Sequence, residues 1–354
     1  MSLLHQYGAG ERRFAEAGFY PEFVLARVTA QYRGVYRIVT ENGEKLAEVA
    51  GRFRFEAKGL VDYPAVGDFV MVDGGEDGHA VIHHLLRRQS SFERTVAGGG
   101  VETQVVAANI DLVFLCMSLN NDYNLSRLER YLVVAWSSGA TPVVVLTKSD
   151  LCENTAIPLR DAAAVAPGVD VVLTSSLDDS VQTIEEYLKP GVTASFIGSS
   201  GVGKSTLINR LAGGELFETA EIRKDGKGKH TTTHRELVLL PNGGLVIDTP
   251  GMRELGVETV DLSQTFSDVE RLSASCRFRD CTHTKEPGCA VLAAIEAGEL
   301  DARRLENYRK LGREAKYDGL TARQIDETKI NAMFGGKTAM KKMMDGVREK
   351  NKRR

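Results

Sequence analysis

The chain has 354 residues, of which 42% are hydrophobic and 26% charged, and its formal net charge is -3. This length exceeds one compact core and predicts two or three domains of ordinary folded composition. The small negative charge excludes a general attraction to nucleic acid, so any polyanion must bind to local patches. Five cysteines without a secretion signal indicate a reducing compartment, and we predict a cytoplasmic protein without membrane segments.

Short alternating apolar runs dominate residues 23–92, among them FVLARVTAQYRGVYRIVT, KLAEVAGRFRF, DFVMVDG and HAVIHHLL. About five short strands separated by turn sequences favour a small barrel of the oligonucleotide-binding (OB) type. Aromatic and basic residues interleave on these predicted strands, which suits RNA binding but equally an ordinary amphipathic barrel. The interleaved residues are Tyr32, Arg33, Tyr36, Arg37, Arg52, Phe53, Arg54 and Phe55.

The pattern changes after residue 92. The glycine-rich stretch SFERTVAGGGVETQ predicts a linker. From Asn109 the apolar runs DLVFLCM, TPVVVLT, VDVVLTS, TASFIGS and GGLVIDT alternate with helical periods, which predicts a parallel sheet covered by helices on both faces. After about Val260 we expect only helices, ending in the basic tail KKMMDGVREKNKRR, which suits rRNA phosphates or is simply a solvated end.

The segment GSSGVGKST matches the phosphate-loop pattern G-x-x-x-x-G-K-[ST] between an apolar strand and a helix. A chance glycine-rich turn would lack that context. Glycines let backbone N–H groups curl around phosphates, Lys204 would neutralise phosphate oxygens, and the Ser205 hydroxyl would bind Mg²⁺. The predicted nucleotide contacts of this loop are Gly198, Ser199, Ser200, Gly201, Val202, Gly203, Lys204, Ser205 and Thr206.

A second phosphate-sensing element, DTPG, follows the apolar run GLVI. We predict that Asp248 holds the Mg²⁺ shell and that the Gly251 N–H senses the γ-phosphate. Between the two elements lies GKGKHTTTH, which is basic and glycine-rich. We predict Thr232 as a second Mg²⁺ hydroxyl, with Thr231 and Thr233 as alternatives. A merely solvated loop is the alternative for the whole segment.

The sequence TKSD follows the apolar run VVVL and predicts a guanine-reading loop. The Asp150 carboxylate can accept two hydrogen bonds from guanine that adenine cannot supply, and a later TSS can offer a backbone N–H to guanine O6. Thr147 stands where asparagine is usual, so a hydroxyl replaces the amide that braces the phosphate loop, and we expect lower affinity. The predicted base contacts are Thr147, Lys148, Ser149, Asp150, Thr174, Ser175 and Ser176.

A cysteine and histidine cluster lies beyond the DTPG element. Three thiolates and one imidazole suffice for a closed tetrahedral Zn²⁺ site, and a site without an open position is structural. So short a spacing makes unrelated buried cysteines the weaker alternative. The predicted ligands are Cys276, Cys281, His283 and Cys289. Cys116 and Cys152 are predicted to be small apolar fillers.

The motifs occur in the order base loop, base loop, phosphate loop, threonine loop and aspartate motif, which is a circular permutation of an ordinary GTPase. With this order, GKGKHTTTH, DTPGMRE and the cysteine cluster, the chain resembles the bacterial small-ribosomal-subunit-dependent GTPases. The resemblance covers most of the chain. It implies an N-terminal extension with an OB barrel, an α/β P-loop GTPase domain and a mostly α zinc domain. We place these domains at residues 1–95, 96–262 and 263–354.

The resemblance also implies what the protein does. We expect a monomer that binds GTP or GDP, Mg²⁺ and one Zn²⁺, and that couples GTP hydrolysis to a late maturation or release step of the small ribosomal subunit, contacting its rRNA. Because the DTPG segment leads directly into the cysteine cluster, we predict that GTP moves this region more than the barrel. A non-catalytic, GTP-dependent RNA-binding switch is the alternative. A kinase would leave TKSD and the cluster unexplained.

The sequence specifies the catalytic residues least. Met252 stands where many GTPases carry a water-orienting glutamine, and Gly201 where potassium-dependent enzymes carry asparagine. We therefore expect slow hydrolysis that small subunits stimulate. Lys204, Thr232 and His230 are the predicted catalytic residues, with His230 orienting the water. A surface histidine without a role is the alternative for His230.

Overall fold

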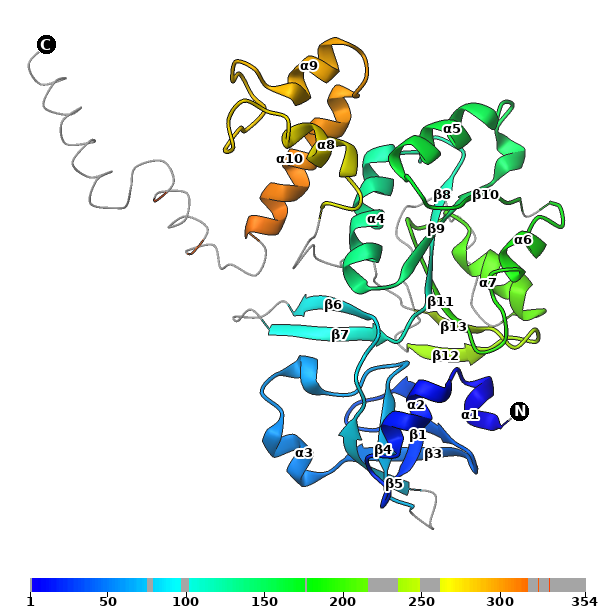
Figure 1. Cartoon of the computed structure of the whole chain (residues 1–354). Helices are drawn as coiled ribbons and strands as arrows, with labels where there is room; N and C mark the ends of the chain where they lie inside the picture. Colours follow the sequence, from blue (N-terminus) through cyan, green and yellow to red (C-terminus); the bar gives the residue numbers. More distant parts are fainter. Residues whose placement is uncertain are drawn as a thin grey trace, which may run out of the picture.

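The computed structural model describes residues 2–74, 79–96, 102–175, 177–215, 235–248 and 262–317, with the single residues 324 and 331. A β-barrel, an α/β sheet and a helical region follow one another along the chain (Figure 1). This arrangement confirms the predicted fold class.

Five strands form the barrel: β1 (Val24–Gln31), β2 (Tyr36–Thr40), β3 (Gly43–Val49), β4 (Phe69–Val72) and β5 (His79–Leu85). They lie in the order β1-β2-β3-β5-β4, and β4 pairs again with β1 to close the barrel. Only β3 and β5 run parallel among these pairs. Val28, Ile38 and Ile82 fill the interior without solvent exposure. The short helices α1 (Leu3–Gln6) and α2 (Glu11–Ala17) pack on the barrel through Leu4 and Phe14.

The prediction that residues 52–55 continue a strand is wrong. β3 ends at Val49, which is its last residue paired with β5, and the helix α3 (Gly51–Glu56) follows, then the turn η1 (Leu60–Asp62). In this helix Phe53 packs near Tyr63, with ring centroids 6.1 Å apart, whereas Phe55 is 90% exposed. The alternation Arg-Phe-Arg-Phe imitates a strand, but the chain has already left the sheet that would pair it.

The predicted linker is also wrong. β6 (Ser91–Val96) and β7 (Glu102–Ala108) form an antiparallel hairpin, and residues 97–101 at its tip lie outside the described residues. Phe92 and Val106 of the hairpin are buried in the hydrophobic core that continues into the α/β sheet. The barrel is therefore joined to the sheet by a packed hairpin rather than by a free tether.

The α/β sheet contains five parallel strands in the order β10-β9-β8-β11-β13. These are β8 (Leu112–Ser118), β9 (Thr141–Thr147), β10 (Val171–Leu173), β11 (Thr193–Gly198) and β13 (Leu245–Asp248). One face is covered by α4 (Leu125–Ser138) and α5 (Ala156–Val165), and the other by α6 (Gln182–Glu185) and α7 (Lys204–Ala212). The phosphate loop follows β11, which lies between β8 and β13, although β8, β9 and β10 precede it in the chain. This order is the predicted circular permutation.

One strand that the sequence did not predict, β12 (Glu236–Leu239), joins the sheet to the barrel. It pairs antiparallel with β13, and Glu236 also pairs with Ala30 of β1. Arg37 of β2 forms an ion pair with Glu236. Nearby, the Arg27 side chain is 1% exposed and donates to the Tyr7 and Asn109 carbonyls at 2.6 and 3.2 Å. The barrel thus has a fixed position against the sheet.

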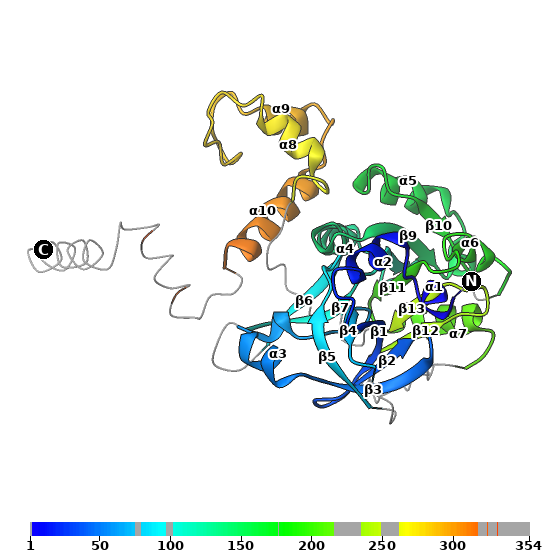
Figure 2. The same ribbon diagram turned by 60° about the horizontal axis from the view of Figure 1, so that its bottom comes forward.

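The C-terminal region is built from α8 (Ser267–Ser273), α9 (Ala290–Glu296) and α10 (Ala302–Tyr317). Phe266, Val291 and Leu305 are buried together with Val133 of α4. The C-terminal region therefore shares a hydrophobic core with α4. Figure 2 shows these three helices together on one side of the molecule. In the described part of the chain, no helix has the length and apolarity needed to cross a membrane.

Candidate functional site

The predicted phosphate loop lies between the end of β11 and the start of α7, at the carboxyl edge of the parallel sheet. Gly201 and Gly203 have φ values of +71° and +106°, which favour glycine. A side chain on Gly198 would lie 2.6 Å from the Cys116 carbonyl oxygen, so this position requires glycine as well. Local geometry therefore accounts for the two glycines of the motif, Gly198 and Gly203, and for the additional Gly201.

The Lys204 side chain turns back into this loop. Its ammonium group donates to the carbonyl oxygens of Gly198 and Ser199, at 2.7 and 2.8 Å. Val202 is buried, Ser200 and Thr206 are exposed, and Ser205 is half-buried in the first turn of α7. The loop thus presents its lysine, its hydroxyl and the amino end of a helix at one place, which suits a bound phosphate chain.

The predicted base-reading loop contacts the phosphate loop directly. The Thr147 hydroxyl donates to the Val202 carbonyl at 2.6 Å, and Lys148 donates to the Gly201 carbonyl at 2.7 Å. Lys148 has a φ of +57°, which turns the chain sharply after β9. Threonine at 147 therefore keeps a brace to the phosphate loop through a single hydrogen bond.

The two base-reading loops also contact each other. Ser175 donates its hydroxyl to Asp150 Oδ1 at 2.6 Å, and the Ser149 N–H donates to the Thr174 carbonyl at 3.1 Å. Arg210 of α7 donates to the carbonyls of Ser175 and Asp178 at 3.2 and 2.8 Å. Sequence reasoning missed Arg210, because the residues that contact it come from a loop more than 30 positions earlier.

Asp122 is a second residue that sequence reasoning missed. It lies just before α4, accepts a hydrogen bond from the Ser199 hydroxyl of the phosphate loop, and forms an ion pair with Arg127 at 2.6 Å. The Asn124 side chain caps the same helix by accepting from the Arg127 N–H. The capping sequence NDYN was a visible signal for the start of a helix, although not for a contact with the phosphate loop.

A small cavity of about 80 Å³ lies where these loops meet, lined by Thr147, Thr174, Val202 and Thr206 among others. A larger hollow of about 710 Å³ lies at the opposite end of the sheet, beside Asp111, Glu186 and Lys189, and none of the motif residues lines it. Chemistry rather than size therefore identifies the candidate nucleotide site.

Several predicted site residues lie outside the described residues. They are Ser176, His230, Thr231, Thr232, Thr233, Gly251 and Met252. Asp248 is described only as the backbone end of β13, where it pairs with Glu236. The roles predicted for these side chains stay predictions.

The predicted metal ligands converge in the C-terminal region. The ligand atoms of Cys276, Cys281, His283 and Cys289 all lie within 4.8 Å of one another. Cys276 Sγ lies 3.8 Å from Cys289 Sγ and 3.6 Å from His283 Nδ1, and Nδ1 lies 3.4 Å from Cys289 Sγ. The edges of a tetrahedral Zn²⁺ site measure about 3.8 Å between sulfurs and about 3.6 Å between sulfur and nitrogen, from bond lengths of about 2.3 and 2.0–2.1 Å. The donor set therefore fits zinc.

Neighbouring groups orient the histidine of this cluster. The Ser273 hydroxyl lies 3.1 Å from His283 Nε2 and donates to the Val269 carbonyl at 2.7 Å, so Nε2–H is the donor and Nδ1 faces the thiols. Burial and the Arg309 guanidinium lower the pKa of His283, which favours the neutral imidazole that binds metal. By contrast, burial raises the pKa of Cys116 to about 12, as expected for an apolar filler.

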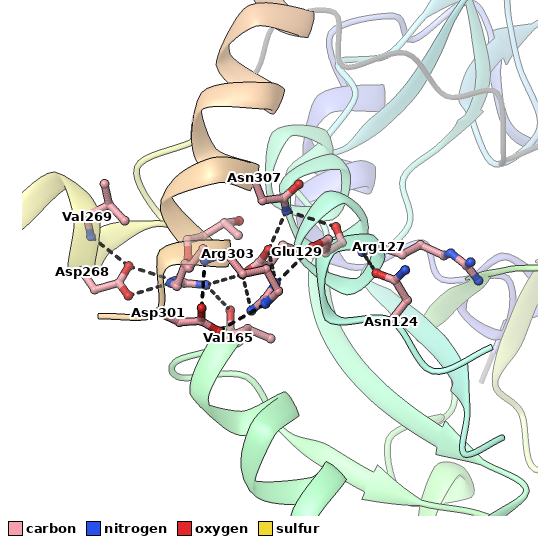
Figure 3. Close-up of polar contacts among 12 residues, drawn as sticks. Asn124, Arg127, Glu129, Val165, Asp268, Val269, Asp301, Arg303 and Asn307 are labelled. Carbon is pink, nitrogen blue, oxygen red and sulfur yellow. Dashed lines mark hydrogen bonds and ion pairs between the residues drawn. The ribbon is translucent and has the colours of Figure 1, made fainter. Parts of the chain in front are cut away.

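A buried polar network holds the C-terminal region against α4 (Figure 3). Glu129 of α4 has no solvent exposure and accepts from Arg303, Arg304 and Asn307 of α10, at 3.1, 2.9 and 2.5 Å. Arg304 also donates to Asp268 at 2.6 Å. Each charge in this network has an opposite partner, which is what makes its burial tolerable.

Comparisons with known proteins agree with this geometry. The profile of the RsgA GTPase family matches residues 85–258. Over 322 residues the chain is 49% identical to the "Small ribosomal subunit biogenesis GTPase RsgA 2" of Lactiplantibacillus plantarum, covering 90% of this chain and 91% of the relative. A protein of the same name from Listeria monocytogenes is 48% identical, with 89% and 90% covered.

Two solved structures are also similar to the chain. YjeQ from Thermotoga maritima has a TM-score of 0.64 at 28% identity and covers 83% of this chain and 98% of its own. YloQ, described as a circularly permuted GTPase, has a TM-score of 0.60 at 30% identity, with 84% and 97% covered. Both likenesses extend over nearly the whole of the solved chains.

Proposed function

The chain belongs to the RsgA GTPase family and is a GTPase, and from this premise we propose that it binds the small ribosomal subunit and couples GTP hydrolysis to a late step of that subunit's maturation or release. The names of the relatives support the partner. The observation that carries the proposal is the contact between the two loops, in which Thr147 and Lys148 bind the carbonyls of Val202 and Gly201. A guanine reader and a phosphate binder thus form one site.

In this proposal the phosphate loop, residues 198–206, binds the phosphates of GTP or GDP, and Lys204 neutralises their charge. Ser205, Thr232 and Asp248 are the residues that would hold Mg²⁺, with Thr231 and Thr233 as alternatives to Thr232. When bound, Mg²⁺ offsets the negative charge that develops on the phosphate oxygens. The Gly251 N–H would then detect the γ-phosphate.

Guanine selectivity is assigned to Asp150, whose carboxylate would accept from N1 and N2 of guanine, and to a backbone N–H of the loop at residues 174–176, which would donate to guanine O6. The hydrogen bond from Ser175 to Asp150 supports this role, because it fixes the carboxylate at the edge of the site. Thr147, Lys148 and Ser149 position that carboxylate and cover the base.

We further propose one structural Zn²⁺ on Cys276, Cys281, His283 and Cys289, supported by the tetrahedral distances among their ligand atoms. The domains are assigned to residues 1–95, 96–262 and 263–354. The working form is a cytoplasmic monomer that contacts rRNA.

The test measures phosphate release and subunit binding by the purified protein. We expect slow hydrolysis by the protein alone and at least tenfold faster hydrolysis with saturating small subunits. The protein should bind small subunits more tightly in the presence of a non-hydrolysable GTP analogue than in the presence of GDP. The second candidate, a non-catalytic RNA-binding switch, is favoured by Met252, which cannot orient water. Nucleotide-dependent binding without any acceleration of hydrolysis would support that candidate and reject ours.

A further inference from the structure

A cavity between the barrel and the β6–β7 hairpin has no role in the GTPase site. Its volume is about 350 Å³, within the range of roughly 300–1,000 Å³ typical of small-molecule pockets. Its lining combines apolar residues with aromatic, amide and basic groups, and no carboxylate is among the described residues that line it. They include Gln31, Tyr36, Arg54, Tyr63 and Gln104.

Two arginines lie on the strand faces that carry the cavity's amides. Arg94 of β6 is directly opposite Gln104 of β7 in the hairpin register, and opposite residues of an antiparallel pair project from the same face. Glu236 pairs antiparallel with Ala30, and continuing this register by one residue would place Arg235 opposite Gln31. Gln31 and Gln104 both line the cavity.

The charges of these two arginines are not compensated by any described carboxylate. Arg94 Nε is buried and has no hydrogen-bond partner, and within the described part of the chain neither arginine forms an ion pair. Burial and the positive charge of Arg94 together lower the pKa of Arg235. Two partly buried like charges repel each other, and elsewhere this chain compensates its buried charges, as it does at Glu129. An anion at this place would relieve the repulsion.

We propose that this cavity binds one unstacked nucleotide of single-stranded RNA, with the base beside Tyr63, the amides of Gln31 and Gln104 at the base edge, and the phosphate on Arg94 and Arg235. Aromatic stacking and a guanidinium pair are the features by which proteins hold unpaired RNA. The inference deepens the rRNA binding proposed above and rests on it. Because Arg235 directly precedes β12, RNA bound here would touch the strand that joins the GTPase sheet to the barrel.

The test uses the full chain with saturating GDP and Mg²⁺, so that the GTPase site is filled. A fluorescein-labelled RNA hexamer of mixed sequence is titrated by anisotropy at several salt concentrations. Arg94→Gln and Arg235→Gln should each weaken binding at least fivefold and reduce the slope of log Kd against log salt by about 0.7. Tyr63→Leu should weaken binding at least fivefold, and Tyr63→Phe should match the parent, because stacking is retained.

Arg160→Gln is the matched control, because it removes the same charge from an exposed site on α5. Circular dichroism should give unchanged or higher melting midpoints for the arginine variants. If they unfold, cross-linking of the parent with 4-thiouridine RNA replaces them and should label peptides containing Tyr63 or Gln104. Parent-like hexamer binding and salt slope in the folded variants, or cross-links confined to other peptides, would overturn the inference. So would displacement of the hexamer by equimolar UMP or AMP, which would indicate a site for free nucleotides.

The outcome is separable from that of the proposed function, since no ribosomal particle is present. If hexamer binding depends on Arg94 and Arg235 but the protein does not bind small subunits, only the proposed function is refuted. If Arg94→Gln, Arg235→Gln and Tyr63→Leu all leave subunit binding and hexamer binding unchanged, only the proposed role of this cavity is refuted.

Discussion

Thr147 illustrates at the scale of one residue how a departure from a motif is accommodated. The sequence predicted a weaker brace, because a hydroxyl replaces an amide. The hydroxyl is buried and reaches the Val202 carbonyl at 2.6 Å, so one hydrogen bond between the loops is retained. A hydroxyl can donate only one hydrogen bond, whereas an amide nitrogen can donate two.

We therefore expect Thr147→Val to weaken GTP binding. The substitution keeps the shape but leaves the Val202 carbonyl unpaired, at a cost of about 1–2 kcal/mol, or roughly 5–30-fold in Kd. Titration with a fluorescent GTP analogue measures this change. Thr141→Val, at the exposed start of the same strand, is the control and should bind like the parent. Equal affinities for all three proteins would show that the brace does not contribute.

Asp150 should determine the choice of base. Asp150→Asn removes the negative acceptor and should cost about 2–4 kcal/mol in GTP affinity, the range for breaking charged hydrogen bonds. Because an amide can donate to the second carbonyl of xanthine, the same variant should bind XTP better than the parent does. Competition between GTP and XTP for the site measures the affinity for each nucleotide. Unchanged GTP affinity would mean that the loop is wrongly assigned.

At the scale of elements, α4 links the phosphate loop to the C-terminal region. Its capping segment contains Asp122, which contacts Ser199, and its buried face carries Glu129, which contacts α10. The hydrophobic pattern of this helix predicted only a face packed on the sheet. The charge on that face is explained by α10, which supplies two arginines.

Glu129→Gln should destabilise the protein strongly. The change leaves the buried Arg304 without a full countercharge, and breaking a buried ion pair costs about 3–5 kcal/mol. Glu314→Gln is the control, because its pair with Arg130 is partly exposed and should cost less than about 1 kcal/mol. Urea denaturation followed by circular dichroism compares the two variants. Similar losses for both would indicate that the network contributes no more than a surface pair.

Zinc binding by the cysteine cluster should depend on the Ser273 hydroxyl, which orients His283. Ser273→Ala removes the acceptor of His283 Nε2–H and should weaken zinc binding by about tenfold, the lower end for such neighbours of metal ligands. Competition with a chromophoric chelator measures the affinity. Ser275→Ala, exposed nearby, should have no effect. Absence of stoichiometric zinc from freshly prepared protein would reject the metal assignment itself.

At the scale of the whole molecule, the structure differs from the sequence-based prediction mainly in how the barrel is connected to the GTPase sheet. The sequence predicted that nucleotide state acts more on the C-terminal region than on the barrel, because residues 249–261 lead there. The structure adds a direct route to the barrel: β12, which follows the threonine loop, pairs with β1, and Arg37 binds Glu236. The C-terminal region is meanwhile held on α4.

We therefore expect the barrel seam to respond to nucleotide as well. Hydrogen exchange in GDP and in a GTP analogue should differ in β12 and in the paired residues of β1 and β2 around Ala30 and Arg37. Residues 43–49, on the part of the barrel away from this seam, are the internal control and should not change. Differences confined to residues 262–289 would support the unequal coupling that the sequence predicted.

The sequence by itself determined the parts whose geometry is local. The phosphate loop, the TKSD loop and the cysteine spacing each act through neighbours a few positions apart, and their order revealed the permutation. The five barrel strands and the parallel strands followed from short apolar runs. The match to the RsgA GTPase family, at residues 85–258, includes the phosphate loop and the TKSD loop.

Only the tertiary structure decided which distant segments meet. The pairing of β12 with β1, the packing of the glycine-tipped hairpin and the contact of Glu129 with α10 join residues far apart in the chain. An apolar or charged pattern states that a face must be buried or paired, but it does not name the partner. The alternation in residues 52–55 was misread for the same reason, since a strand exists only where another strand is present to bind it.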